Sequence, residues 1–153
     1  MENKIGSLEH VIGHTYDTVY DLLFTTERVI AVVIRHPNDT IHNLGLTGLL
    51  LGEGLSGRNS RLQRVKIAGE RRRDYQEKAF DEIVRSHRFN FEIPYSAVTS
   101  VEITRGFLKS RLIFSISRPP IHEHTVHFTL TKGQLPNARN LLDSAVPSKI
   151  KNR

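Results

Sequence analysis

Residues 90–117 of this chain read NFEIPYSAVTSVEITRGFLKSRLIFSIS, and this stretch decides the fold. In two of its segments an apolar residue recurs at every second position: Val101 and Ile103, then Leu112, Phe114 and Ile116. A period of two, with β-branched and aromatic residues on one face, is typical of half-buried antiparallel strands. The stretch therefore predicts a three-stranded meander with turns at residues 94–96 and at Gly106.

Further strands are predicted on both sides of this meander. They are residues 9–20, 21–24, 29–34 and 125–131. Val29–Ile34 is a continuous run of apolar, mostly β-branched residues, which indicates a strand covered on both faces. Residues 134–146 carry an apolar stripe at helical spacing, so a C-terminal amphipathic helix is expected to close the fold.

A segment of different composition, residues 41–88, interrupts the strands. Its first part, residues 44–57, holds six leucines and five glycines. Its second part, residues 59–87, has apolar residues at helical spacing and predicts one long helix. We therefore expect a single α+β, mainly β, domain over residues 1–153 with a helical insertion at about residues 41–88.

Three stretches resemble the pleckstrin-homology-like superfold, in particular its bacterial and archaeal PH-like and GRAM-like members. They are the hairpin sequence DLLFTTERVIAVV at residues 21–33, the strand sequence FEIPYSAVTSVEI at residues 91–103, and the closing helix. The resemblance implies a partly open antiparallel β-barrel of two sheets, capped by the C-terminal helix. It also implies a binding module for lipid head groups, peptides or further copies of the same domain.

The chain departs from this family in its first hairpin loop. Family members that bind phosphoinositides use Lys and Arg there, whereas residues 13–21 contain no Lys or Arg and two Asp. Head-group binding at the family's usual place is therefore not expected.

The positive charge is concentrated in the insertion. The chain has a formal net charge of +6, and residues 58–88 hold ten Lys/Arg against five Asp/Glu. Seven basic residues are predicted to lie outside the core and to form an anion-binding or membrane-binding surface: Arg58, Arg61, Arg64, Lys66, Arg71, Arg72 and Arg73. Three interpretations stay open, namely a solvated helix face, contact with an anionic membrane surface, and contact with nucleic acid.

The leucine-rich run predicts self-association. A contiguous apolar patch of this kind is more typical of a contact than of free surface, and burial within the same domain and contact with a membrane stay open beside self-association. The candidate contact residues are Leu46, Leu49, Leu50 and Leu51. The expected partner is therefore another copy of the chain in a homo-oligomer, and no small-molecule substrate is evident.

No catalytic residue, metal site or cofactor is predicted. The chain has no cysteine and lacks the Gly-x-Ser-x-Gly and His-Glu-x-x-His motifs. Gly52–Gly57 matches G-x-G-x-x-G, but no parallel βαβ unit accompanies it. His122, His124 and His127 are the nearest approach to a metal cluster, yet two ligands on one strand leave a zinc site short of partners. A metal-dependent enzyme using His122 and His124 is the weaker alternative to a non-enzymatic binding or scaffold module.

A cytoplasmic location, with peripheral membrane contact as the open alternative, is expected. The absence of cysteine suits a reducing compartment, and the first residues lack the pattern of a secretion signal. The longest apolar run, Leu44–Leu55, is 12 residues long and contains Glu53, whereas a membrane-spanning helix needs about 20 apolar residues.

Overall fold

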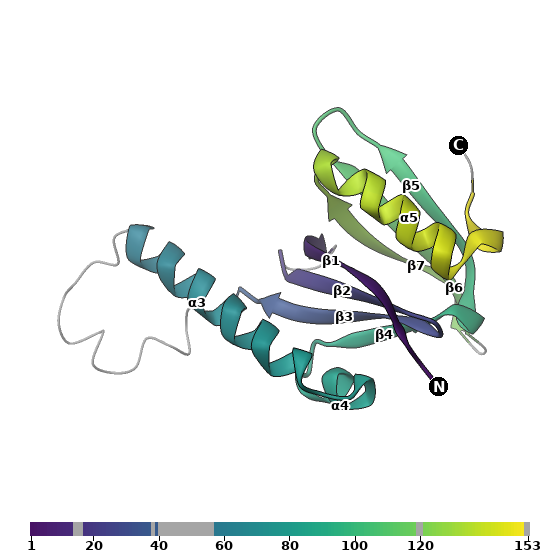
Figure 1. The fold of residues 1–153 in the computed structure, drawn as a ribbon. Helices are drawn as coiled ribbons and strands as arrows, with labels where there is room; N and C mark the ends of the chain where they lie inside the picture. Colours follow the sequence, from purple (N-terminus) through teal and green to yellow (C-terminus); the bar gives the residue numbers. More distant parts are fainter. Residues whose placement is uncertain (14–16, 38, 40–56, 119–120, 152–153) are drawn as a thin grey trace.

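The computed structural model describes residues 1–13, 17–37, 39, 57–118 and 121–151; for residues 57–63, 118 and 121–123 it describes the backbone. Within this part, seven antiparallel strands form an open sheet in the order β4-β3-β2-β1-β7-β6-β5 (Figure 1). The strands are β1 (Lys4–Gly13), β2 (Val19–Thr25), β3 (Arg28–Arg35), β4 (Phe91–Pro94), β5 (Val98–Arg105), β6 (Ser110–Arg118) and β7 (Ile121–Leu130). The predicted α+β, mainly β, class is confirmed.

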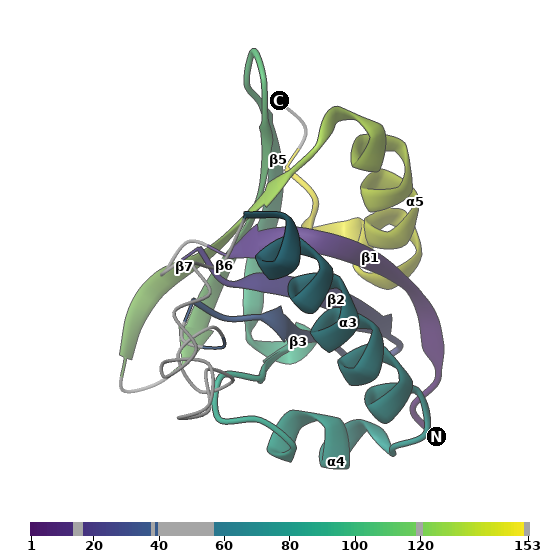
Figure 2. The same ribbon diagram turned by 90° about the vertical axis from the view of Figure 1, so that its left-hand side faces the viewer.

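Three helices and three short 3-10 turns complete the described fold. They are α3 (Gly57–Gln76), α4 (Phe80–Arg85), α5 (Leu135–Ala145), η1 (Tyr95–Ala97), η2 (Lys132–Gln134) and η3 (Pro147–Lys149). Helices α3 and α4 lie between β3 and β4 in the chain and pack on β3, whereas α5 follows β7 and packs on β1 and β2 (Figures 1 and 2). The C-terminal helix predicted at residues 134–146 is confirmed.

Strand β1 joins the two halves of the sheet. It pairs with β2 along most of its length, from Lys4 to Ile12, but meets β7 through the pairs Ile12–Thr129 and Gly13–Phe128. This short junction makes one continuous, bent sheet where two sheets were expected.

The first apolar cluster fills the concave side of the bent sheet. Phe24, Phe114 and Phe128 are among its largest fully buried side chains, and Leu142 of α5 covers them from the open side. The alternation in β6 is confirmed, because Leu112, Phe114 and Ile116 are all buried in this cluster. The predicted three-stranded meander is wrong, because β4 pairs with β3 at the opposite edge of the sheet from β5, and only β5 and β6 form a hairpin.

A second cluster lies on the opposite face of the sheet. Ile30, Val32 and Ile34 of β3 pack there against Ala68 and Tyr75 of α3 and Ile83 of α4. Every residue from Val29 to Ile34 is buried, which confirms that this strand is covered on both faces.

The single long helix predicted at residues 59–87 is wrong. The helix ends at Gln76, Ala79 is extended with ψ of 153°, and α4 then begins at Phe80. An uninterrupted helix of 29 residues would be about 43 Å long, whereas the eight-residue strand β3 that it covers is roughly 27 Å long. The break lets Ile83 turn back onto the sheet, while Val65 at the other end is exposed.

Two strand boundaries also differ from the prediction. Residues 9–20 form the end of β1 and the start of β2 rather than one strand, because the chain turns between Gly13 and Thr18, whose N–H and carbonyl are hydrogen-bonded at 2.8 Å. Asp17 in this turn has a φ of 48°, a conformation that a continuing strand does not contain. Strand β7 begins at Ile121, four residues before the predicted start.

The core assignment predicts opposite effects for two phenylalanines. Phe114→Ala should lower the free energy of unfolding by about 3–5 kcal/mol, because it removes a fully buried ring. Phe107→Ala should change it by less than about 0.5 kcal/mol, because that ring is 90 % exposed. Urea unfolding of both variants measures the difference, and equal effects would contradict this core.

Candidate anion-binding surface

The seven basic residues predicted as a surface all lie on α3, but they fall into different environments. Arg64, Lys66 and Arg73 are exposed. Arg58 and Arg61 belong to the first turns of α3, and their side chains lie outside the described part of the structure. Arg71 and Arg72 are partly buried and bound to carboxylates, so they are not available as free surface charges.

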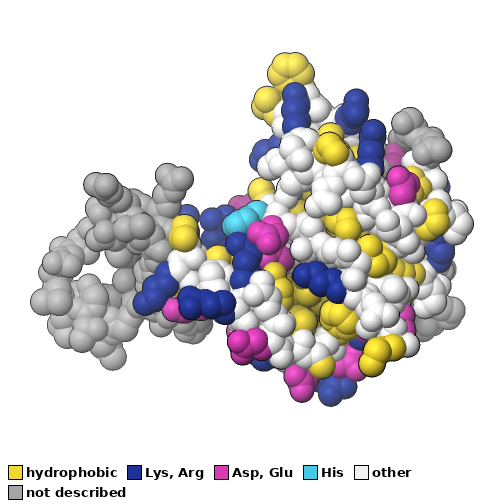
Figure 3. Space-filling model, viewed as in Figure 1, with side chains coloured by type: hydrophobic (Ala, Val, Ile, Leu, Met, Phe, Trp, Pro, Cys, Tyr) yellow, Lys and Arg dark blue, Asp and Glu magenta, His cyan; other side chains and the backbone are white. Residues whose placement is uncertain are grey.

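Arg64 is exposed although it lies on the same helix face as Ala68 and Tyr75, which are buried. The reason is the overhang of α3, whose first half extends past the edge of the sheet (Figure 1). Lys and Arg side chains gather along this helix in the space-filling view (Figure 3). The exposed part of the predicted surface is therefore the overhanging half of α3 together with the outward face near Arg73.

The Arg72 guanidinium holds α3 on the sheet through a buried carboxylate. Its Nε lies 2.6 Å from Oδ2 of Asp21 and its Nη2 lies 2.8 Å from Oδ1. The side chain of Asp21 has no exposed surface, while Arg72 retains 20 %. Such a two-bond arrangement is the geometry in which arginine pairs best with a carboxylate.

A β-bulge in β1 supplies a further donor to this carboxylate. The pairing of β1 with β2 shifts between Leu8 and Val11, and His10 in the bulge has a φ of 55°. The backbone N–H of His10 thereby points at Oδ1 of Asp21, 3.0 Å away. The Nδ1 of His10 lies 3.1 Å from Nη2 of Arg72 and must accept, because a guanidinium can only donate.

The Asp21 cluster is saturated, which argues against acid–base chemistry there. Oδ1 accepts from His10 and Arg72, and Oδ2 accepts from Arg72 and from the Tyr75 hydroxyl at 2.9 Å. A carboxylate offers about four lone-pair positions, and these four bonds fill them. Burial, together with the negative charge of Asp21, raises the pKa of Tyr75 well above its ordinary value, so its proton stays in place.

Arg71 makes a second clamp on the same helix. Its two Nη atoms each lie 2.8 Å from an oxygen of Asp39, and Nη1 also donates to the carbonyl of Ile34 at the end of β3. Asp39 further accepts from the backbone N–H of His36 at 2.7 Å. Arg71 thus fastens α3 to the segment that leaves β3.

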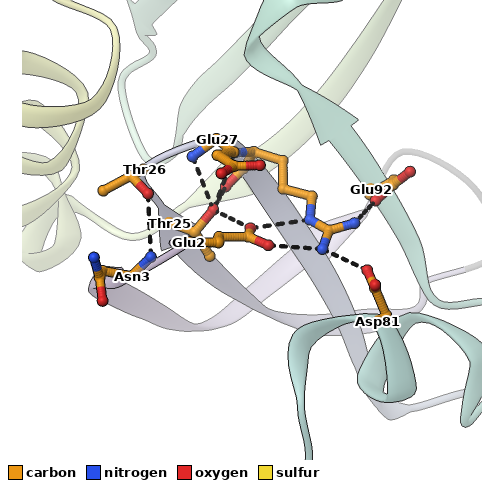
Figure 4. A network of polar contacts seen from close by, with 8 residues as sticks. Glu2, Asn3, Thr25, Thr26, Glu27, Asp81 and Glu92 are labelled. Atoms are coloured by element: carbon orange, nitrogen blue, oxygen red, sulfur yellow. Dashed lines mark hydrogen bonds and ion pairs between the residues drawn. The ribbon is translucent and has the colours of Figure 1, made fainter.

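Arg28 makes a third clamp, at the other end of the sheet (Figure 4). It holds Glu2 by two bonds of 3.0 and 2.7 Å, and it also donates to Asp81 of α4 and Glu92 of β4. Thr25 adds a 2.6 Å bond to Glu2. The N-terminal residues, α4 and β4 are therefore joined through one guanidinium.

Sequence reasoning missed these clamps, although one signal pointed to the Asp21 cluster. Asp21 stands within the otherwise apolar-rich strand VYDLLFT, and a carboxylate in a buried strand requires a charged or hydrogen-bonding partner. The prediction that all seven basic residues form a free anion-binding surface is corrected accordingly, because Arg71 and Arg72 are bonded in the fold.

The clamps use more acidic than basic residues. Seven ion pairs in the described part of the chain join seven Asp/Glu to four Lys/Arg. Ion pairing among the described residues therefore neutralises more carboxylates than cations.

The structure gives less information on the other predicted sites. Among the described residues, no three His, Asp or Glu side chains are placed to hold a metal ion. His124 is exposed, His127 lies 2.7 Å from the hydroxyl of Thr125, and the side chain of His122 lies outside the described part. Leu46, Leu49, Leu50 and Leu51 lie entirely outside the described residues. No helix of the described chain is both long and apolar enough to cross a membrane.

A cavity of about 210 Å³ opens beside the β1–β7 junction. Aromatic rings of Tyr20, Phe91 and Phe128 line it, together with Val126 and His127. The rings also contact one another, with centroids 5.6 to 6.2 Å apart. Among the described residues, no Lys, Arg, Asp or Glu lines this cavity.

Comparison with known proteins does not identify the class of this chain. No protein-family model matches the chain, and no curated protein or solved structure matches it.

The clamp geometry predicts that two adjacent arginines behave differently. Arg72→Met should lower the free energy of unfolding by about 3–5 kcal/mol, because it leaves the buried Asp21 carboxylate without its charged partner. Arg73→Met is the matched control and should stay within about 0.5 kcal/mol, because that side chain is exposed. Urea unfolding of the two variants tests this, and an unaffected Arg72 variant would contradict the clamp.

The Arg28 clamp predicts an acid-sensitive contribution to stability. The hydrogen bonds from Arg28 lower the pKa of Glu2 below its ordinary value of 4.5. A carboxylate whose pKa is lowered by folding stabilises the fold fully above that ordinary value, and the contribution is lost as the pH falls through the folded pKa. The difference in unfolding free energy between the wild type and Glu2→Gln should therefore shrink as the pH is lowered below 4.5. Urea unfolding at neutral pH and at successively lower pH measures it, and a constant difference would contradict the prediction.

Proposed function

We propose that this chain is a non-enzymatic binding module of the pleckstrin-homology-like superfold that docks on a polyanionic surface. Seven antiparallel strands followed by a C-terminal helix, with the helical insertion after β3, support this class. The docking surface is the exposed side of α3, with Arg64, Lys66 and Arg73 as its described cations. Arg58 and Arg61 belong to the same helix, and their side chains lie outside the described part of the structure.

One observation carries the proposal, namely the separation of the cations into two sets. Arg28, Arg71 and Arg72 are neutralised inside the clamps, together with most of the acidic groups near them. Arg64, Lys66 and Arg73 form no ion pair with the described residues. An anionic partner would provide the negative charges that these three cations lack within the described fold. Each contact between such a cation and an anionic membrane surface is worth about 1 kcal/mol.

The saturation of the buried polar groups supports binding rather than catalysis. The carboxylate of Asp21 and the guanidinium of Arg28 are occupied by structural partners, so neither is poised to move a proton or hold a substrate. Self-association through Leu46, Leu49, Leu50 and Leu51 stays a prediction, and light scattering of the purified chain over a range of concentrations tests it.

The docking proposal predicts strong, salt-dependent binding to anionic vesicles. Reversing three exposed charges together (Arg64→Glu, Lys66→Glu and Arg73→Glu) should weaken binding by roughly a hundredfold or more, because each lost cation removes about 1 kcal/mol. Binding of the wild type should also weaken steeply with added salt, since exposed charges are screened. Vesicle co-sedimentation at several salt concentrations measures both effects.

A charge-matched control separates this surface from net charge. Lys4, Arg139 and Lys151 are exposed and lie away from α3 in the sequence, and reversing all three gives the same net charge. This control should retain most of the binding. If both triple variants lose binding equally, α3 is not the docking surface. Preference for a nucleic-acid duplex over vesicles at equal salt would favour nucleic acid as the anionic partner.

A further inference from the structure

The hairpin that joins β5 to β6 places two large apolar side chains in water. Phe107 is 90 % exposed and Leu108 is 76 % exposed, and the two are adjacent in the chain. Single exposed apolar residues are common on protein surfaces. Two adjacent apolar side chains at the tip of a projecting hairpin form a contiguous apolar surface, which indicates a site of contact with a partner.

Local geometry keeps these side chains outward. The strands pair in register up to Arg105 and Ser110, and the N–H of Gly106 donates to the carbonyl of Lys109 at 2.9 Å. A Cβ at Gly106 would meet that same carbonyl oxygen, so glycine is needed for this tight turn. Phe107 and Leu108 are the two residues inside the turn, and the hairpin carries them beyond the body of the protein (Figures 1 and 2).

A collar of cations surrounds the base of this tip. Its members are exposed: Arg105, Lys109, Arg111 and Lys132. Residues 103–118 and 128–134 contain no Asp or Glu, and Glu102 of β5 is the one acidic residue in the sequence of the two hairpin strands. The Nζ of Lys132 lies 5.8 Å from the centre of the Phe107 ring, so one cation sits directly beside the apolar tip. Figure 3 shows the same order on the projecting end, with hydrophobic side chains outermost and Lys and Arg side chains beneath them.

The apolar tip and the cations at its base match the layers of an anionic bilayer. An inserting element first meets the anionic head groups and then the acyl chains, so an apolar tip above a cationic collar satisfies both layers at once. A second copy of the hairpin would bring two cationic collars together, which costs electrostatic repulsion. A nucleic acid would meet the collar, but the leucine at the tip gives it neither a hydrogen bond nor a stacking surface.

We propose that the Phe107–Leu108 tip inserts into the head-group and acyl boundary of an anionic lipid bilayer, with Arg105, Lys109, Arg111 and Lys132 contacting the head groups. The inference deepens the proposed docking function, on which it rests, and names a lipid bilayer as the polyanionic surface. The hairpin inserts, while the exposed cations of α3 add electrostatic attraction.

The first test compares binding to vesicles of phosphatidylcholine with and without phosphatidylserine. The double variant F107A/L108A should bind the phosphatidylserine vesicles about tenfold more weakly or worse, because two large apolar side chains no longer leave water. Asn140→Ala is the control, because Asn140 is exposed on α5, outside both α3 and the hairpin. This control should bind like the wild type.

The second test reports on insertion directly. The chain contains no tryptophan, so Phe107→Trp introduces a single fluorescent reporter at the tip. Its emission should shift to the blue on adding phosphatidylserine vesicles and become shielded from an aqueous quencher. The same reporter in an Asn140→Trp variant, on the exposed side of α5, should show no such shift, which distinguishes insertion of the hairpin from general adsorption.

The outcomes separate the two proposals. If the wild type fails to bind phosphatidylserine vesicles at low salt, both the docking function on a membrane and the insertion are overturned. If the wild type binds but F107A/L108A binds equally well and the tip reporter does not shift, insertion is overturned and electrostatic docking stands. If the double variant instead lowers the mass measured by light scattering, or abolishes binding to a nucleic-acid duplex, the tip serves that partner and the bilayer assignment is overturned.

Discussion

The arrangement of helix and sheet depends on the buried pair between Asp21 and Arg72. A carboxylate with no exposed surface is costly unless every lone pair is satisfied, and Asp21 draws its donors from two elements: His10 in the bulge of β1, and Arg72 and Tyr75 of α3. The bulge is needed because it turns the N–H of His10 toward β2. The pair therefore fixes both the irregularity of the strand and the rotation of the helix about its axis.

The other two clamps extend the same constraint to the edges of the insertion. Arg71 ties α3 to the end of β3, and Arg28 ties α4 to β3, β4 and the N-terminal residues. Together with the apolar contacts of Ala68, Tyr75 and Ile83, they make α3 and α4 part of the domain rather than an appended unit. Because the rotation of α3 is fixed, so is the set of its cations that faces water.

The sequence predicted what depends on short-range periodicity. The alternation at Leu112, Phe114 and Ile116 and the unbroken run Val29–Ile34 each identified a strand and its buried faces. The sequence did not predict the break between α3 and α4, because no helix-ending residue marks it. The break is explained by the length of β3, which a single helix would exceed. Nor could residue type distinguish Arg72 from Arg73, since the partner of Arg72 lies 51 residues away in the chain.

The formal charge of a segment of this protein therefore does not predict how much exposed charge that segment carries. Residues 58–88 have the largest excess of basic residues, yet Arg71 and Arg72 are neutralised by ion pairs within the fold. The tip half of the β5–β6 hairpin, residues 103–111, carries Arg105, Lys109 and Arg111 and no carboxylate, and its turn holds Phe107 and Leu108 in water. Pairing of acidic groups in the clamps secures the insertion on the sheet. Arg64, Lys66 and Arg73 form no ion pair with the described residues. The same ion pairs that stabilise the architecture therefore determine where an anionic partner is favoured.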